Sequence, residues 1–256
     1  MKIFVANTGR SGSRYMAHMF AELTDIPAYC ESTPYCLGQT MKEMNNDYPD
    51  ISETTRMVLA EKVKRIKEDS KNDNYFESNN MFIKTFVWAV MEYFGNVYCI
   101  YLHRNPWEQF LSHADRNWKF GQDWFLKSHW KMNIQRVEPE LTYYENMIWN
   151  WYEVRARFYH WKDKFVKTYD FDFQRIEDLE EYYRLFEHFG IEYKKVDKLP
   201  EVPKTDHNEP DPVKESSANT LGFIRQNQDK KSVEWAFMSD EQIIKENIRR
   251  GKVERQ

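Results

Sequence analysis

The chain has 256 residues, of which 41% are hydrophobic and 16% aromatic. This length is enough to bury a full core, as one large domain or two small ones. The formal net charge is −4 and both signs are well represented, which argues against a general nucleic-acid-binding or anionic-membrane surface.

The cysteines and the apolar runs bear on location. Cys30, Cys36 and Cys99 are odd in number and lack the spacing of metal ligands. We therefore expect free thiols in a reducing compartment. No stretch approaches the roughly 18 apolar residues of a membrane span. These observations predict a cytoplasmic protein without a membrane span.

The start of the chain has the pattern strand, turn, helix. Lys2–Asn7 is rich in β-forming residues, and residues 15–23 have the apolar spacing of a helix. A helix start with free N–H groups, next to permanent cations, is typical of an anion site. A tight turn without a ligand is the alternative. The residues predicted to bind a phosphate or sulfate are Arg10, Ser11, Gly12, Ser13 and Arg14.

This turn is not the loop of a nucleoside triphosphatase. Walker A has four residues between its glycines and then Gly-Lys-Ser/Thr, whereas Gly9 and Gly12 are three apart and no Lys follows Gly12. Residues 10–13, Arg-Ser-Gly-Ser, resemble the 5′-phosphosulfate loop of sulfotransferases, which use 3′-phosphoadenosine 5′-phosphosulfate (PAPS). The resemblance implies that Arg10 lies near the transferring sulfuryl group.

Ile26–Cys30 has the composition of a short second strand, and Glu31 follows it directly. Ligands of open α/β sheets bind at the carboxyl ends of strands. Glycan-modifying sulfotransferases carry a catalytic Glu soon after a comparable strand, and Glu31–Pro34 is a looser version of that motif. The resemblance implies Glu31 as the catalytic base. A helix-capping or solvated loop carboxylate is the alternative.

Met41–Asn80 is predicted to be a mainly helical insertion, with a helix around Glu53–Lys67. One flank of that helix is basic and is interpreted as a solvated face without chemistry. Its cations are Lys62, Lys64, Arg65 and Lys67.

Met81–Phe86 is predicted to be a third apolar strand that carries a Lys-Thr pair at its end. The pair resembles the Lys-Thr or Lys-Ser of sulfotransferases and implies that Lys84 lies near the sulfuryl group. In the small-molecule branch of the family a catalytic His follows, but here Phe86 takes that place. The base must then be another residue, and His103 and His113 are alternatives to Glu31.

Asn96–Leu102 is a buried strand by composition, and Pro106 has the place of a first helical residue. Ser112 follows Arg104 by eight residues. This resembles the 3′-phosphate motif of sulfotransferases and implies that Arg104 and Ser112 bind the 3′-phosphate. A strand-to-helix turn with a helical serine is the structural alternative.

The remainder of the chain is predicted to begin with a mainly helical insertion, Asn117–Phe165. A strand at Phe165–Phe171 and a helix at Leu179–Phe189 with a Gly190 C-cap then resemble the C-terminal half of sulfotransferases. Residues 200–219 are predicted to form a loop or lid. The cations available to close over a nucleotide are Arg225, Lys230 and Lys231.

We predict an α/β fold with a mostly parallel central sheet and helices on both faces. The resemblance implies one P-loop-NTPase-like sulfotransferase domain over 1–256. It also implies sulfuryl transfer from PAPS to a hydroxyl or amine of a small molecule or glycan, without a metal. The implied catalytic residues are Arg10, Glu31 and Lys84. The alternatives are a small-molecule kinase, which would need Mg²⁺ and an Asp where His103 and Arg104 stand, and a non-catalytic nucleotide-binding protein.

Overall fold

The computed structural model describes residues 1–36, 51–114 and 143–202. The chain divides into two compact units, Met1–Asn105 with Val154–Thr205 and Pro106–Glu153 with Asp206–Gln256. The first unit holds the sheet and the loops that follow its strands. That residues 1–256 form one domain stays a prediction.

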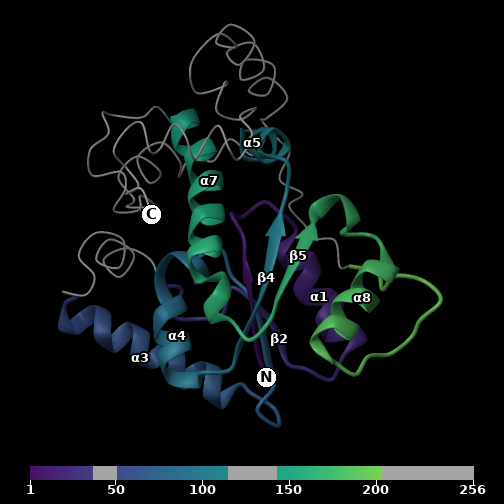
Figure 1. Ribbon diagram of the computed structural model, residues 1–256, viewed down its shortest axis with the longest axis horizontal. Helices are drawn as coiled ribbons and strands as arrows, with labels where there is room; N and C mark the ends of the chain where they lie inside the picture. Colours follow the sequence, from purple (N-terminus) through teal and green to yellow (C-terminus); the bar gives the residue numbers. More distant parts are fainter. Residues whose placement is uncertain (37–50, 115–142, 203–256) are drawn as a thin grey trace, which may run out of the picture. The chain divides into compact units, whose positions relative to one another are not determined.

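Five strands form one sheet in the first unit, in the order β2-β3-β1-β4-β5 (Figure 1). They are β1 (Lys2–Ala6), β2 (Ala28–Cys30), β3 (Tyr75–Ser78), β4 (Val97–His103) and β5 (Thr168–Asp172). Every neighbouring pair is parallel, and Val5 of the central β1 lies opposite Ser78 of β3 and Ile100 of β4. The carboxyl ends of these strands therefore meet at one edge, as the predicted parallel α/β fold requires.

Helices alternate with the strands along the described chain. They are α1 (Ser13–Leu23), α3 (Glu53–Glu68), α4 (Val87–Phe94), α5 (Pro106–Ala114), α7 (Tyr143–Trp161) and α8 (Leu179–Phe189). A π-helix, η1 (Phe82–Phe86), leads into α4, and the short 3-10 segments η3 (Lys162–Lys164) and η4 (Phe173–Arg175) flank β5. Parallel strands need such crossover connections, because a tight hairpin joins only antiparallel ones.

Both faces of the sheet are covered by helices, as predicted (Figure 1). Ile3 and Val5 of β1 face a core cluster that includes residues of α1 and α8. Phe4 points to the opposite face, because successive strand residues alternate, and its ring stacks on Phe82 with centroids 4.6 Å apart. On that same face Phe158 of α7 stacks on Tyr101 at 4.7 Å.

Helix α8 matches its predicted bounds. Its N-cap Asp178 accepts a hydrogen bond from the Glu180 backbone N–H (3.1 Å), and Gly190 ends the helix at φ 72°. Gly190 adopts the left-handed conformation that closes many helices and that glycine tolerates best. The helix buries Tyr182 and Phe186 in the core cluster.

The prediction of a third strand at Met81–Phe86 is wrong. Residues 82–86 form the π-helix η1, and the strand lies earlier, at Tyr75–Ser78. Consecutive buried apolar residues fit a buried helix as well as a buried strand. The true strand carries Glu77 and ends at Ser78, both fully buried, so its sequence has less of the apolar character expected of a central strand. The predicted helical insertion therefore contains both α3 and β3.

The prediction that the basic flank of α3 is solvated is wrong for Lys62. The side chain of Lys62 is 0% exposed and its Nζ pairs with Glu77 Oε1 at 2.7 Å. Lys64 and Arg65 are exposed and lie near Glu61. Lys62 belongs to the buried stripe because it follows Leu59 by three positions.

Two further sequence expectations can be compared with the structure. Cys30, Cys36 and Cys99 are free thiols, as predicted. Among the helices in the described ranges, none has both the length and the apolar character needed to cross a membrane.

Candidate functional site

The loop after β1 has the geometry of an anion-binding turn. Gly9, Arg10 and Gly12 all have positive φ, at 77°, 54° and 86°. The Asn7 side chain fixes the first bend by accepting a hydrogen bond from the Gly9 N–H (2.8 Å). No side-chain hydrogen bond caps the start of α1 within the described chain, and its first turn contains no acid. Its first N–H groups and the helix dipole therefore favour a negative ligand.

Ser11 provides a test of whether an anion fits. Its residue is 0% exposed, and the buried Oγ has no hydrogen-bond partner among the residues that the structure describes. Leaving a buried hydroxyl unsatisfied costs about 1–3 kcal/mol. A phosphate or sulfate oxygen at this turn would accept a hydrogen bond from the Ser11 hydroxyl, so the residues present fit such a group.

The two predicted phosphate motifs meet in the fold. Arg104, which follows β4, donates from Nη1 to the Arg10 carbonyl oxygen at 3.2 Å. Its guanidinium carbon also lies 4.2 Å from the centre of the Phe173 ring. Cation–π contact and this hydrogen bond hold Arg104 at the edge of the turn after β1.

Gly12 makes room for the same aromatic residue. A Cβ at Gly12 would lie 3.1 Å from ring carbons of Phe173 and 3.1 Å from Ile176 Cδ1. Both neighbours belong to the segment between β5 and α8. The glycine is therefore required by close packing and by its positive φ, and the contribution of this segment to the site was not visible in the sequence motifs.

Glu31 lies at the carboxyl end of β2, as predicted. It adopts φ 55°, and its backbone N–H donates to the Ser78 carbonyl oxygen at 3.0 Å. Its Oε1 accepts a hydrogen bond from Asn80 Nδ2 at 2.8 Å. A Cβ at Gly9 would lie 3.6 Å from that same Nδ2, so Asn80 joins the carboxylate to the first loop. Sequence reasoning missed Asn80, because a single Asn after a strand carries no distinctive signal.

The charge environment links Glu31 to two predicted site residues. Burial raises the pKa of Glu31 above its usual value, while the Arg14 and Lys84 cations oppose that rise. Glu77 adds to the rise through like-charge repulsion. A carboxylate whose pKa is raised is a better proton acceptor near neutral pH. The structure thus places Arg14, Glu31 and Lys84 within electrostatic reach of one another.

Lys84 is buried in η1, with its residue 2% exposed. Its carbonyl oxygen accepts a hydrogen bond from Arg157 Nη1 of α7 at 2.5 Å. Phe86, at the place of the histidine in the small-molecule branch, is wholly buried and packs edge-on to Phe4. Phe86 is therefore a core residue.

His103, the last residue of β4, is bound by the neighbouring strand. Its Nε2 pairs with Asp170 Oδ1 of β5 at 2.7 Å, and its ring stacks on Tyr101. A carboxylate partner of this kind fixes the orientation of the imidazole ring. Asp170 was another residue that the sequence motifs did not single out.

Four other predictions are not decided here. Ser112 lies in α5, in the second unit, so its meeting with Arg104 stays a prediction. The side chain of His113 and the cations Arg225, Lys230 and Lys231 lie outside the described residues, as does the predicted lid from 203 onward.

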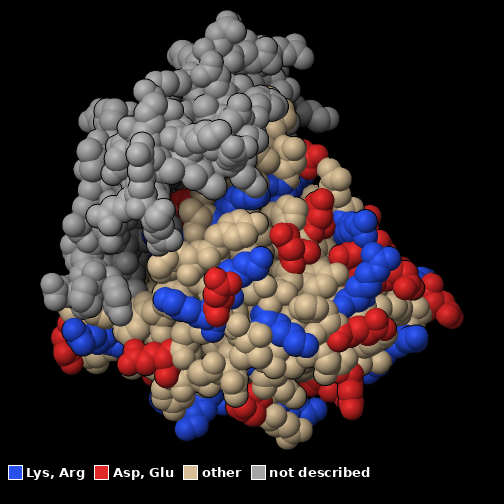
Figure 2. Space-filling model, viewed as in Figure 1, with Lys and Arg blue, Asp and Glu red and all other residues tan. Residues whose placement is uncertain are grey.

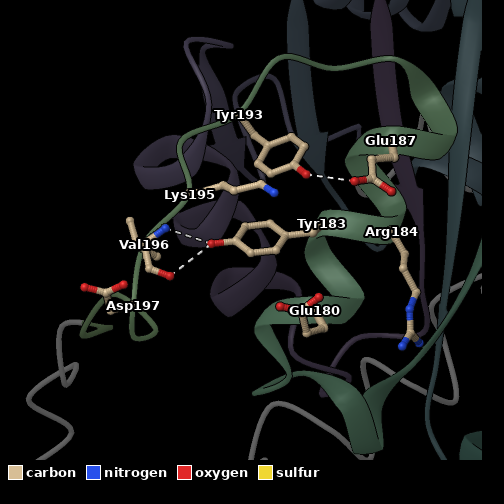
Figure 3. Close-up of a pocket in the computed structure, with 8 residues that line it drawn as sticks. All are labelled: Glu180, Tyr183, Arg184, Glu187, Tyr193, Lys195, Val196 and Asp197. Carbon is tan, nitrogen blue, oxygen red and sulfur yellow. Dashed lines mark hydrogen bonds between the residues drawn. The ribbon is translucent and has the colours of Figure 1, made fainter.

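One open hollow of about 320 Å³ lies on the outer side of α8 (Figure 3). Tyr183 OH accepts a hydrogen bond from the Val196 N–H (2.8 Å), and Tyr193 OH donates to Glu187 (2.9 Å). Its lining residues are Glu180, Tyr183, Arg184, Glu187, Tyr193, Lys195, Val196 and Asp197. None of them belongs to a loop at the carboxyl ends of the strands, so this hollow is separate from the predicted site.

Charge on the rest of the described surface is mixed. Figure 2 shows acidic and basic side chains interspersed on the visible face, in keeping with the balanced composition. Within the described ranges, His, Cys, Asp and Glu side chains do not gather in groups of three that could hold a metal ion.

Comparison with known proteins gives matches among solved structures only. No protein-family model and no curated protein sequence matches the chain. Among solved structures, a sulfotransferase from Alicyclobacillus acidocaldarius superposes with a TM-score of 0.44 and 14% identity. The superposition covers 88% of this chain and 93% of that one. A likeness this loose carries no argument about function, and the α/β class rests on the sheet itself.

Proposed function

We propose that the chain is a sulfotransferase that moves a sulfuryl group from PAPS to a hydroxyl or amine. The observation that carries the proposal is the hydrogen bond from Arg104 to the Arg10 carbonyl, which joins the ends of β1 and β4. Chain connections leave these neighbouring strands in opposite directions, toward β2 and toward β5. Ligands of open α/β sheets bind in the crevice at such a point.

The donor nucleotide would bind along this crevice. The N–H groups of residues 11–14, with Ser11 Oγ, would hold the 5′-phosphate at the start of α1. Ser13 and Arg14 would add a hydroxyl and a cation from the first turn of the helix. Arg104 would bind the 3′-phosphate, with Ser112 as its predicted partner, because a guanidinium matches phosphate oxygens with paired donors.

In the reaction, a lone pair of the acceptor oxygen or nitrogen forms a bond to sulfur. The bond from sulfur to the 5′-phosphate oxygen breaks, and its electron pair stays on the phosphate. Glu31 would take the proton that the acceptor loses. Arg10 and Lys84 would stabilise the charge that develops on the sulfuryl and leaving oxygens. Adenosine 3′,5′-bisphosphate leaves as the second product, so atoms and charge balance without a metal.

The acceptor is proposed to be a small molecule or a glycan. A P-loop kinase is disfavoured because the turn lacks the Walker lysine and because β4 ends in His103 and is followed by Arg104, with no Asp at either position. A non-catalytic nucleotide-binding protein would share the donor site but would have no use for a half-buried carboxylate within electrostatic reach of Lys84.

Binding and turnover separate these three functions. We expect adenosine 3′,5′-bisphosphate to raise the thermal unfolding temperature in the absence of Mg²⁺, and ATP with Mg²⁺ to have a smaller effect. Incubation with sulfur-labelled PAPS and a panel of phenols, amines and glycans should then yield a labelled acceptor. Stabilisation by ATP–Mg²⁺ alone would favour the kinase. Stabilisation by the bisphosphate without transfer to any acceptor would favour the non-catalytic protein.

A further inference from the structure

A buried ion pair joins α3 to β3 and contacts the turn that carries Glu31. The side chains of Lys62 and Glu77 are both 0% exposed, and Nζ lies 2.7 Å from Oε1. Burying two charges has a large desolvation cost, and apolar replacements of such pairs are often neutral or stabilising. Stability alone is therefore a weak reason for this pair to be present.

The pair holds the backbone of Ser32, the residue after Glu31. Lys62 Nζ donates to the Ser32 carbonyl oxygen at 2.7 Å and to its Oγ at 2.8 Å. The Ser32 N–H in turn donates to Glu77 Oε1 at 3.0 Å. Both backbone polar groups of Ser32 are thus bound by the two members of the pair.

The Glu77 carboxylate accepts two further hydrogen bonds. Asn79 Nδ2 donates to Glu77 Oε1, and Tyr75 OH donates to Oε2, both at 2.8 Å. Tyr75 OH additionally lies 3.0 Å from Ser32 Oγ. A network whose buried polar groups are satisfied in this way is rigid and defines one arrangement of the turn.

Glu31 needs such support. It adopts φ 55°, in the left-handed region that non-glycine residues seldom occupy, and such a conformation persists only where its surroundings impose it. The strand before it, β2, has three residues and is an edge strand, with β3 as its one partner in the described part of the chain. The backbone bond from Glu31 to Ser78 and the anchored Ser32 fix the turn on its two sides.

We propose that the Lys62–Glu77 pair is a positioning device for Glu31, which by holding Ser32 presents the carboxylate to Asn80 and the cations of the site. The inference rests on the proposed function where it treats Glu31 as the base. Lys62 and Glu77 are positioning residues, since neither is exposed to a ligand.

The decisive variant is Lys62→Met, which removes the donors to Ser32 and leaves Glu77 in place. The two possible roles of Lys62 move the pKa of Glu31 in opposite directions. Loss of the Lys62 charge alone would leave the Glu77 carboxylate less neutralised and raise that pKa further. Loss of position would let the half-buried Glu31 side chain move into solvent, and its pKa would fall toward the usual 4.5. The other ionisable groups around Glu31, namely Arg14, Lys84 and Cys30, are unchanged in the variant.

The pKa of Glu31 is measured by NMR titration of carboxyl-labelled glutamate, with its signal assigned by the loss of that signal in Glu31→Gln. Lys64→Met is the matched control, because it makes the same change at an exposed place on the same helix. Lys62→Gln removes the charge but keeps a hydrogen-bond donor. Where Lys62→Met does not fold, the double variant Lys62→Met/Glu77→Met removes both charges together and replaces the pair by apolar side chains.

We expect Lys62→Met to bind adenosine 3′,5′-bisphosphate like the wild type, with a lowered Glu31 pKa. Its kcat should fall by roughly 10-fold to 10²-fold, since small misplacements of a reacting group have effects of that size. Lys62→Gln should recover part of the loss, and the double variant should show the same fall in kcat. An unchanged or raised Glu31 pKa in folded Lys62→Met, or wild-type kcat in the double variant, would overturn the inference.

Failure of the proposed function would look different. A wild-type chain that neither binds the bisphosphate nor transfers sulfate would remove the sulfotransferase proposal. The titration of Glu31 does not depend on turnover, so it would still decide whether the buried pair holds that carboxylate in place.

Discussion

The two edges of the parallel sheet hold their cations differently. At the amino edge, Lys2 Nζ binds Ser70 Oγ at 2.9 Å, the Asp73 carbonyl at 2.9 Å and Asp73 Oδ1 at 2.7 Å. The N-terminal amine also donates to the Asp73 carbonyl, at 2.7 Å. These oxygens belong to one short segment of the chain, so charge at this edge is matched locally.

At the carboxyl edge the cations come from separate segments of the chain. Arg10 and Arg14 follow β1, Lys84 follows β3 and Arg104 follows β4. Their convergence depends on the order of the strands and brings positive charge to a helix start with no acid in its first turn. The cations at the amino edge hold the fold, whereas those at the carboxyl edge would bind the polyanionic donor that we propose. Variants at the two edges should therefore alter different properties.

The largest expected effect is that of Glu31→Gln. It keeps the size and the hydrogen-bonding oxygen but removes the basic group, so kcat should fall by about 10²-fold or more. In the wild type, kcat should also fall as pH drops below the raised pKa of Glu31, because the carboxylate becomes protonated. This fall of kcat at low pH should be absent in Glu31→Gln. A variant with near-normal turnover would move the search for the base to His103 or His113.

Arg104→Ala should weaken binding of adenosine 3′,5′-bisphosphate by about 1.5–3 kcal/mol, the usual worth of a charge-assisted contact. Binding of adenosine 5′-monophosphate, which lacks the 3′-phosphate, should change much less. Calorimetric titration of both nucleotides gives the comparison, and Arg104→Lys serves as the control that keeps the charge but not the guanidinium plane over Phe173. Equal weakening for both nucleotides would show that Arg104 has a structural role.

Gly12→Ala tests the packing under the first loop. Gly12 has φ 86°, and a non-glycine residue in the left-handed region costs about 1–2 kcal/mol. The added Cβ would also press on Phe173 and Ile176 at 3.1 Å. Gly190→Ala is the matched control, since its φ is 72° and nothing lies within 4 Å of the new Cβ. Urea unfolding should show the greater loss for Gly12→Ala, and equal losses would mean that the neighbours move aside freely.

The smallest effect belongs to the amino edge. The hydrogen bond and the charge of Lys2 lower the pKa of Asp73 below its usual 3.8. The contribution of the Asp73 carboxylate to stability is therefore fully present above pH 3.8 and is lost as pH falls through the lowered pKa of Asp73. Asp73→Asn should lower the thermal unfolding temperature slightly at neutral pH, because the carboxylate is 86% exposed and screened by water. The gap to the wild type should close in acid, and bisphosphate affinity should be unaffected; a change in affinity would contradict the separation of the two edges.

Elements with strong local signals were predictable from the sequence. Helix α8 carries its cap residue Gly190 and an apolar stripe, and β4 is a continuous apolar run followed by Pro106, so both were confirmed close to their expected bounds. The loop after β1 was predictable for the same reason. Its glycines, serines and arginines have local preferences that do not depend on the rest of the fold.

What depends on distant partners was not predictable. Lysine is usually found at the protein surface, and Lys62 is buried because Glu77, in another element, pairs with its charge. That same Glu77 made β3 less apolar than a central strand usually is, and the strand was predicted at residues 81–86 instead. Asn80 and Phe173 act through contacts with Glu31 and Arg104, residues far from them in sequence.

The contact between Arg104 and Arg10 spans 94 residues and exists only when β4 is paired with β1. Closing a loop of that length carries an entropy cost that long-range strand pairing must offset, and such pairings are slow to form. We therefore expect the proposed anion site to form late in folding. Adenosine 3′,5′-bisphosphate would stabilise the finished sheet rather than its fragments, and its binding would report when β4 has joined the strands that precede it in the chain.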